Sequence, residues 1–320
     1  MRMRRTLAYL VFASCVVLFV VKNRAADVSD VRSGDWTISK SDEAGKVEFS
    51  LIEHHHHGQS SHQSDWPATS FQGVDFSKPG RQDVHFTIAR DAGKIECDGF
   101  LNNGEGAGLF HFQPDANYPR EMQALGFSVV DDKNDEKQFS MAVMDVTLEF
   151  AKQMKNEHLS DLDADKLIAF RIFHVDSAFI QELRAEGLNV SDSDKLVAFR
   201  IHGVTPEMVR SLHQAGYSPD EDTLIAMRIH GATPEWMEQL KRLGYDHIDL
   251  EKLIAFRIHG VSPEFIQKVQ SLGYSHPDPD ELIAMRIHNV TPEYISDMKS
   301  RGIHGLSIDK LVSMRIHGID

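Results

Sequence analysis

The chain has 320 residues, of which 41% are hydrophobic, and a formal net charge of −14 at pH 7. This length suits two domains, and the apolar fraction is sufficient for a core. Nucleic acids and anionic lipids are excluded as main partners because both need a clustered basic surface, which the sequence has only at its extreme N-terminus.

Residues 1–28 are typical of a secretory signal or an N-terminal membrane anchor. A basic start is followed by an apolar run from Leu7 to Val21, somewhat shorter than the roughly 20 residues of a spanning helix. Asn23 or Arg24 occupies the position where a cleavage site needs a small residue, which favours an uncleaved anchor over a cleaved signal. In both cases residues from 25 onward are expected outside the cytoplasm, anchored to the inner membrane by residues 7–21 or secreted to the periplasm.

Residues 29–113 form a predicted β-rich domain, because apolar and polar residues alternate in short runs, as in half-buried antiparallel strands. Five runs carry this pattern, and they include Trp36 and Ile38, Val47 to Leu51, Val84 to Ile88, Ile95 to Gly99, and Phe110 with Phe112. Arg90–Gly93 predicts a turn, and Gly104–Gly108 predicts a hairpin loop. Residues 53–83, rich in His, Ser, Gln and Asp, are expected to form one long loop.

From about residue 114 a repeating unit replaces the strands. Its leading Leu recurs at 167, 196, 224, 253, 282 and 311, and its closing Gly at 187, 216, 244, 273 and 302. The steps are 29 residues, apart from one of 28. This regularity predicts a helical repeat array over residues 114–320.

Each unit is predicted to contain two short helices. The second helix begins at a Thr or Ser N-cap followed by Pro at the first helical position, and the closing Gly ends it about ten residues later. The N-caps are Thr205, Thr233, Ser262 and Thr291. Because one such pair cannot bury its apolar face alone, the predicted fold class is α+β: a small antiparallel β-rich domain followed by an α-solenoid of 29-residue helix pairs.

An Arg occurs once per unit, four residues after the leading Leu and in the last turn of the first helix. This column could be a ladder that binds an acidic partner, through Arg200, Arg228, Arg257 and Arg286. The favoured interpretation is structural, because a cation in this place can satisfy free carbonyls and the negative helix end.

Histidine raises the question of a metal site. The column from His202 to His317 is ascribed to helix ends, because neighbouring helices about 8–10 Å apart cannot easily share one ion. His54, His55, His56 and His57 are better metal candidates, since several imidazoles in one loop can converge on a transition metal. Weak binding by a solvated loop is the favoured interpretation, and no cofactor is predicted. Cys97 is expected to be buried and inert.

The unit Leu253–Glu264, the turn Arg90–Gly93 and the segment Gly106–Phe110 resemble the extracytoplasmic tails of bacterial membrane metallopeptidases similar to β-lactamase-inducing sensor peptidases. The resemblance spans roughly residues 30–320. The family's multi-pass peptidase domain and its zinc motif have no counterpart here, so its catalytic residues cannot be transferred. What the resemblance implies is an envelope-facing module attached to a membrane segment.

The sequence therefore predicts a non-enzymatic, extracytoplasmic binding or scaffold module of the bacterial envelope, with a protein or peptide partner. Two alternatives stay open. One is a hydrolase with a site between the β-rich domain and the first repeats, for which Asp91, Glu96 and Asp98 are the candidate residues, and the other is metal binding through the His54–His57 loop. The C-terminal helix, without a polar capping version of the repeat, suggests a homo-oligomer or a partner at that end.

Overall fold

A computed structural model describes residues 32–55, 58–129 and 136–319. The predicted anchor in residues 1–28 lies outside these ranges. Arg32–Asp320 form one compact unit. Across the described residues, no helix combines the length and the apolar character that crossing a membrane requires.

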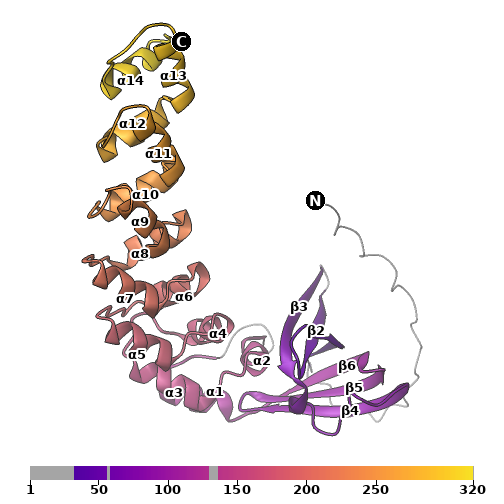
Figure 1. The fold of residues 1–320 in the computed structure, drawn as a ribbon. Coiled ribbons are helices and arrows are strands. Elements are labelled where there is room, and N and C mark those ends of the chain that lie inside the picture. The colour runs from indigo at the N-terminus through magenta and orange to yellow at the C-terminus, as the bar shows by residue number, and fades with distance from the viewer. Residues whose placement is uncertain (1–31, 56–57, 130–135, 320) are drawn as a thin grey trace. The chain divides into compact units, whose positions relative to one another are not determined.

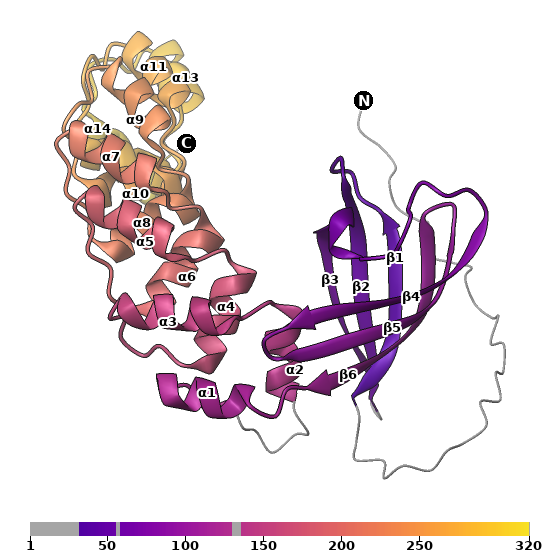
Figure 2. The ribbon, with the colours of Figure 1, turned by 90° about the horizontal axis from the view of Figure 1, so that it is seen from below.

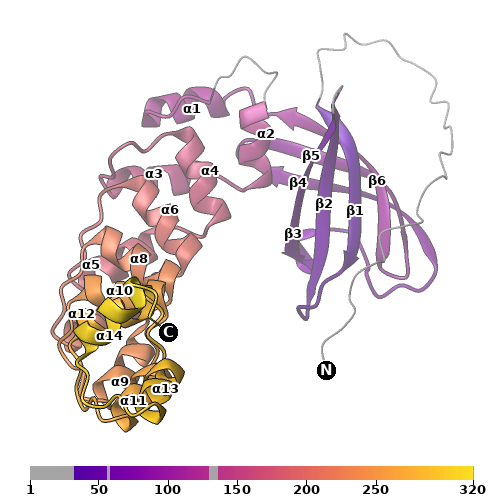
Figure 3. The ribbon, with the colours of Figure 1, turned by 90° about the horizontal axis from the view of Figure 1, so that it is seen from above.

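The N-terminal part of this unit is one antiparallel sheet (Figures 2 and 3). Its strands are β1 (Ser33–Lys40), β2 (Lys46–His55), β3 (Gly58–Pro67), β4 (Arg81–Arg90), β5 (Gly93–Asn102) and β6 (Glu105–Pro114). The order across the sheet is β3-β2-β1-β6-β5-β4. Strands β1–β3 and β4–β6 therefore each form a three-stranded antiparallel meander, and the two meanders are joined where β1 pairs with β6. Helices follow the sheet, and the α+β class is confirmed.

The expectation of one long loop over residues 53–83 is wrong. Strand β2 continues to His55, and residues 58–67 form the edge strand β3, which pairs with β2 from Lys46↔Pro67 to His55↔Gly58. A short 3-10 helix at Ala68–Ser70 and an irregular segment up to Gly80 then lead to β4. Apart from Trp66, strand β3 has few apolar residues, because an edge strand can be held mainly by main-chain hydrogen bonds to its neighbour.

The predicted Arg90–Gly93 turn is confirmed, whereas the predicted hairpin loop over Gly104–Gly108 is wrong. Only Asn103 (φ 55°) and Gly104 (φ 85°) make the turn between β5 and β6, as in a two-residue hairpin with two positive φ angles. Gly106 and Gly108 lie within β6. A Cβ at Gly108 would stand 2.0 Å from the Asp98 carbonyl oxygen and 2.6 Å from Trp36 Nε1, so the indole needs glycine at this position.

The inner face of the sheet carries the alternating apolar residues that the sequence indicates. Trp36 and Phe86 meet edge to face with ring centroids 5.2 Å apart, and Phe71, from the segment after β3, packs against Phe86 at 5.4 Å. Cys97 on β5 is fully buried, as expected, and burial raises the pKa of its thiol.

Residues 118–316 contain the helices (Figure 1). They are α1 (Tyr118–Leu125), α2 (Glu136–Val143), α3 (Leu148–Asn156), α4 (Ala164–Ile172), α5 (Ser177–Ala185), α6 (Ser193–His202), α7 (Pro206–Gln214), α8 (Glu221–His230), α9 (Pro234–Lys241), α10 (Leu250–His259), α11 (Pro263–Ser271), α12 (Pro279–Ile287), α13 (Pro292–Ser300) and α14 (Ile308–Ile316). The even-numbered helices are the predicted first helices and the odd-numbered ones the second. Each even-numbered helix contacts the next even-numbered helix.

The predicted helix ends are confirmed. The hydroxyl oxygens of Thr205, Thr233, Ser262 and Thr291 each accept a hydrogen bond from the backbone N–H three residues on. Gly203, Gly231 and Gly260 end α6, α8 and α10 in the left-handed conformation. Asn289, which stands at the corresponding position after α12, also has a positive φ of 56°.

Helix α2 packs on β5 and β6. The Phe139 ring stacks on Phe110 at 5.6 Å and meets Phe112 edge to face at 5.2 Å. The buried Gln138 amide donates to the carbonyl oxygens of Ala92 and Asp115, at 2.7 and 2.8 Å. The buried helix α2 therefore joins the core of the sheet to that of the helices.

We expect Gly108→Ala to lower the free energy of unfolding by about 1–3 kcal/mol, because the added Cβ must displace the Trp36 indole or a strand. Urea denaturation followed by tryptophan fluorescence measures the change. Leu109→Ala is the matched control, since Leu109 is the neighbouring residue and is 66% exposed. Equal stability of Gly108→Ala and the wild type would contradict the packing described here.

Candidate functional site

Of the His54–His57 candidates, His54 and His55 lie at the end of β2, in the β2–β3 pairing and not in a long loop. His54 is on β2, where its Nε2 lies 2.6 Å from Asp35 Oδ2 on β1. His55 is the last residue of β2, whereas His56 and His57 lie outside the described residues. In the described ranges no group of three or more His, Cys, Asp or Glu side chains is arranged to hold a metal ion.

Two further histidines pair with carboxylates on the outer face of the sheet. His85 Nδ1 on β4 lies 2.7 Å from Asp98 Oδ1, and His111 Nε2 on β6 lies 2.8 Å from Glu96 Oε2. Asp98 also raises the pKa of His85, by accepting its hydrogen bond and by its negative charge. The His85 and Asp98 side chains are 63% and 65% exposed, and those of His111 and Glu96 are 37% and 27% exposed. Asp98 and Glu96 are thus residues of an ionisable sheet surface.

Asp91, the third candidate of the hydrolase alternative, lies in the β4–β5 turn and not on the sheet face that carries Glu96 and Asp98. Its Oδ2 accepts a 2.9 Å hydrogen bond from the Leu148 backbone N–H, at the start of α3. Nearby, Arg90 Nε lies 3.1 Å from Asp145 Oδ1, and Asp145 Oδ2 forms a second ion pair with Arg171 Nη2 at 3.3 Å. These contacts join the β4–β5 turn to the first helices, and they do not bring Asp91 together with Glu96 and Asp98.

The arginine row consists of the Arg in each first helix: Arg171, Arg200, Arg228, Arg257, Arg286 and Arg315. Each of three members donates from Nε to the carbonyl oxygen of the His that ends the preceding first helix. The bonds are Arg228 to His202 at 3.0 Å, Arg257 to His230 at 3.1 Å and Arg286 to His259 at 3.2 Å. The arginines thus bind free helix carbonyls, as the structural interpretation expects, but the carbonyls belong to the neighbouring unit.

The guanidinium groups also contact an aromatic ring and a C-cap glycine of the preceding unit. The Arg257 guanidinium lies over the Trp236 ring at 5.2 Å from its centroid, and Arg286 lies over Phe265 at 5.1 Å. A Cβ on the C-cap Gly231 would stand 2.8 Å from Arg257 Nη2. One guanidinium therefore uses a carbonyl, an aromatic face and a glycine, a combination that we call the arginine clamp.

A tyrosine that follows the closing Gly makes a second contact between units, which sequence reasoning missed. The hydroxyls of Tyr217, Tyr245 and Tyr274 donate to the carbonyl oxygens of Ile248, Pro277 and Leu306, at 3.0, 2.8 and 2.8 Å. The recurrence of Gly-Tyr at the unit period is the signal that could have revealed it.

The isoleucine row is also absent from the sequence-based candidates. It consists of Ile172, Ile201, Ile229, Ile258, Ile287 and Ile316, which are 46–58% exposed. Each follows an Arg of the arginine row on an even-numbered helix. Large apolar side chains exposed at the same place in six helices are unusual for a surface without a partner.

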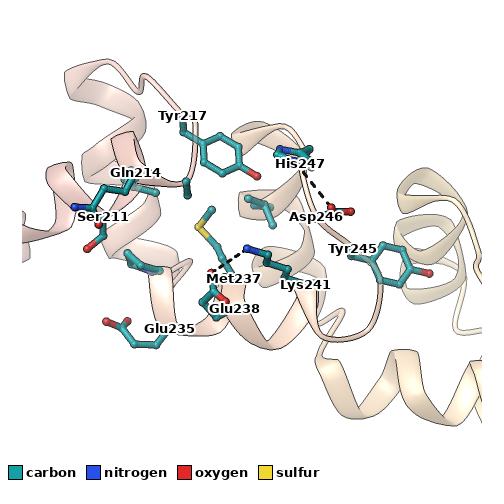
Figure 4. A pocket seen from close by; sticks show the side chains of 14 residues that line it. Ser211, Gln214, Tyr217, Glu235, Met237, Glu238, Lys241, Tyr245, Asp246 and His247 are labelled. Carbon is teal, nitrogen blue, oxygen red and sulfur yellow. Dashed lines mark ion pairs between the residues drawn. The ribbon is translucent and has the colours of Figure 1, made fainter.

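A cavity of roughly 370 Å³ lies between α7, α9 and the loops after them (Figure 4). Leu212, Met237 and Leu253 supply apolar lining, and Glu235 and Glu238 supply carboxylates. The adjacent loop between Gly216 and Leu224 is one residue shorter than the loop between Gly244 and Leu253, which is the origin of the single 28-residue step. The lining also holds Lys241, which pairs with Glu238 at 3.8 Å, and His247, so it combines apolar side chains with charges of both signs, as a binding cavity does.

No protein-family model matches this chain. A search among curated proteins also finds no match.

We expect Arg257→Met to lower the stability of the helical region by about 1–2 kcal/mol, because the hydrogen bond to His230 and the contact with Trp236 are both lost. Chemical denaturation followed by far-UV circular dichroism measures this. Arg242→Met, at an exposed arginine after α9, controls for loss of a positive charge. If both variants unfold alike, the clamp does not stabilise the array.

The pKa of His85 is expected above its ordinary 6.5 in a titration by NMR. A raised pKa means that the pair stabilises the fold fully below the unfolded-state pKa, and that the contribution disappears as pH rises through the folded-state pKa. Asp98→Asn should bring the pKa of His85 back towards its ordinary value. Asp83→Asn, an exposed carboxylate on the same strand as His85, should leave it raised, and an unchanged His85 pKa in Asp98→Asn would contradict the assignment.

Proposed function

We propose that this protein is a non-enzymatic binding or scaffold module of the bacterial envelope, held or released on the extracytoplasmic side through residues 1–28. Its helices are proposed to form an α-solenoid of 29-residue units, which offers an extended surface to a protein or peptide partner. The observation that carries this proposal is the isoleucine row, with every member 46–58% exposed.

The contacts within the array support a binding role for that row. The arginines are engaged by carbonyls of the preceding unit, and the tyrosine hydroxyls by carbonyls of the following one. The leading leucines are buried in the helical core. The isoleucine, in contrast, remains 46–58% exposed in all six units, although polar residues are the more usual occupants of such an exposed helix position.

Arg200, Arg228, Arg257 and Arg286, the residues of the possible partner-binding ladder, already contact other parts of the chain. Arg200 lies over the Phe179 ring at 3.9 Å, and the other three donate to carbonyls. A partner that took up these guanidinium groups would have to break contacts between units. We therefore propose that the isoleucines bind the partner and that the arginines hold neighbouring units together.

The test uses the full chain, immobilised and exposed to envelope extracts of the source bacterium, with bound proteins quantified by mass spectrometry. Ile258→Ser with Ile287→Ser should reduce capture of specific partners by roughly tenfold, as for central interface residues. Gln239→Ser with Gln267→Ser, two exposed residues of second helices, is the matched control. Unchanged capture in the isoleucine variant would contradict the proposal.

A further inference from the structure

We infer that the cavity between α7 and α9 is a binding site for an arginine side chain that a partner protein or peptide presents. The cavity is formed mainly by second helices and the loops after them (Figure 4), whereas the isoleucine row lies on the first helices. The site therefore goes beyond the proposed function and does not depend on it. Its basis is a missing contact between units, a tyrosine ring without the stacking partner of its counterpart, and a carboxylate at a position where other units have none.

The eighth residue of three second helices forms a hydrogen bond with the preceding unit. Arg184 Nη2, Gln270 Nε2 and Lys299 Nζ each donate to the carbonyl oxygen of the residue just before that unit's closing position. The acceptors are Glu157, Leu243 and Leu272, at 2.9, 3.3 and 2.5 Å. At these three places the chain's own side chains therefore bridge successive second helices.

Between α7 and α9 this bridge is missing. The eighth residue of α9 is Lys241, but its Nζ lies 3.8 Å from Glu238 Oε1 on its own helix. The corresponding acceptor is the carbonyl oxygen of Ala215, and no donor among the described residues forms a hydrogen bond with it. Lys241 and Glu238 are 61% and 57% exposed, so their pair is weak and an incoming cation can replace it.

The space beside the closing Gly is open at the same step. A Cβ added at Gly216 would meet no atom within 4 Å, whereas one at Gly187 or Gly244 would meet a histidine ring at 3.6 or 3.5 Å. The 28-residue step of the repeat also occurs here, in the shorter loop after Gly216. The departure from the period and the open space thus coincide.

A tyrosine ring at the cavity wall lacks the stacking partner of its counterpart. In the next unit the His276 ring stacks on Tyr245, with centroids 4.6 Å apart. The corresponding pair is His247 and Tyr217, but the His247 side chain is 82% exposed. The Tyr217 hydroxyl is held by the Ile248 carbonyl oxygen at 3.0 Å. The ring is therefore fixed beside the cavity, where a planar cation can stack on it.

The charges of the lining favour a cationic ligand. Glu235, Glu238 and Asp246 supply three carboxylates, which outnumber the lysine and the histidine of the lining. Glu238 is the fifth residue of α9, a position at which the other second helices from α3 to α13 have no carboxylate. Their residues there are Lys152, Gln181, Arg210, Gln267 and Ser296.

An arginine of the chain itself shows how a guanidinium uses such acceptors. Arg184 donates from Nη2 to the Glu157 carbonyl oxygen and pairs through Nη1 with the Glu157 carboxylate. The cavity offers the same two kinds of acceptor, the Ala215 carbonyl and the Glu238 carboxylate. A planar guanidinium can donate to both and stack on Tyr217, whereas the ammonium of lysine is a point charge without a face.

The apolar lining and the size of the cavity complete the fit. Leu212, Met237 and Leu253 can contact the methylene groups of an arginine side chain. The volume of roughly 370 Å³ is near the lower limit of the roughly 300–1,000 Å³ typical of ligand pockets. The cavity therefore suits one side chain, presented by a protein surface or a flexible peptide, better than a folded segment.

NMR titration of the full chain in mild detergent, with isotope-labelled methionine methyl groups, tests the inference. The probe is N-acetyl-arginine methylamide. The Met237 signal, assigned by its loss in Met237→Leu, should shift saturably with a Kd on the order of 1 mM, as expected for so small a ligand. The signal of Met285 on α12, outside the cavity, should not move. The neutral citrulline analogue and the lysine analogue should each bind at least roughly tenfold more weakly.

A charge-removing variant tests the role of the carboxylate. Glu238→Gln should weaken binding of the arginine probe by roughly three- to tenfold, because the guanidinium loses a charged acceptor. Glu264→Gln is the matched control, since it removes the same charge from α11, outside the lining, and should bind like the wild type. An unchanged Met285 signal in both variants shows that the array is folded.

A Met237 signal that stays in place up to about 20 mM of the arginine probe would overturn the inference, because even a weak specific site would then be largely filled. Equal binding of the citrulline or the lysine analogue by the wild type would overturn it too, and so would equal binding of the arginine probe by Glu238→Gln and Glu264→Gln. None of these measurements involves the isoleucines, so the site can fail while capture of partners through the isoleucine row succeeds, and the reverse.

Discussion

The helical region depends on the contact of one guanidinium with the end of the neighbouring helix. A helix leaves its last carbonyls without partners, and in this protein the Arg of the following unit supplies the donor. Because the same guanidinium lies on an aromatic ring and against a glycine without a side chain, it also sets how closely successive units approach. The tyrosine hydroxyls and the Lys–Asp pairs add further contacts between the same units.

The clamp explains why the most chemically suggestive columns of the sequence are structural. Arginine and histidine recur because each unit has the same carbonyls to satisfy, and the histidine carbonyl is the acceptor for the next arginine. The proposed binding role therefore falls to the isoleucine, which lies between the arginine and the histidine in the sequence. The isoleucine lies on the helix face opposite the buried leucine and phenylalanine, and 46–58% of its surface stays exposed.

Prediction from the sequence succeeded where structure is decided locally. Thr205 caps α7 because its hydroxyl needs only the N–H of Met208, three residues away, and Gly203 ends α6 because it tolerates a positive φ. It failed for β3, whose residues lack apolar alternation and which is held by main-chain bonds to β2. It also failed to separate the isoleucine from the other apolar residues of Leu253–Ile258, because four of those six side chains are large and apolar and only packing decides which of them are buried.

The sequence by itself determined the α+β class, most strand positions, the helix ends and the period of the units, since each follows from interactions within a few residues. Only the tertiary structure decided what the recurring Arg, His and Tyr columns do. The partner of Arg257 is a carbonyl 27 residues earlier, and the partner of Tyr245 is a carbonyl 32 residues later. Main-chain oxygens carry no sequence signature, so these contacts become visible only when packing brings the units together, and the exposed isoleucine row becomes visible with them.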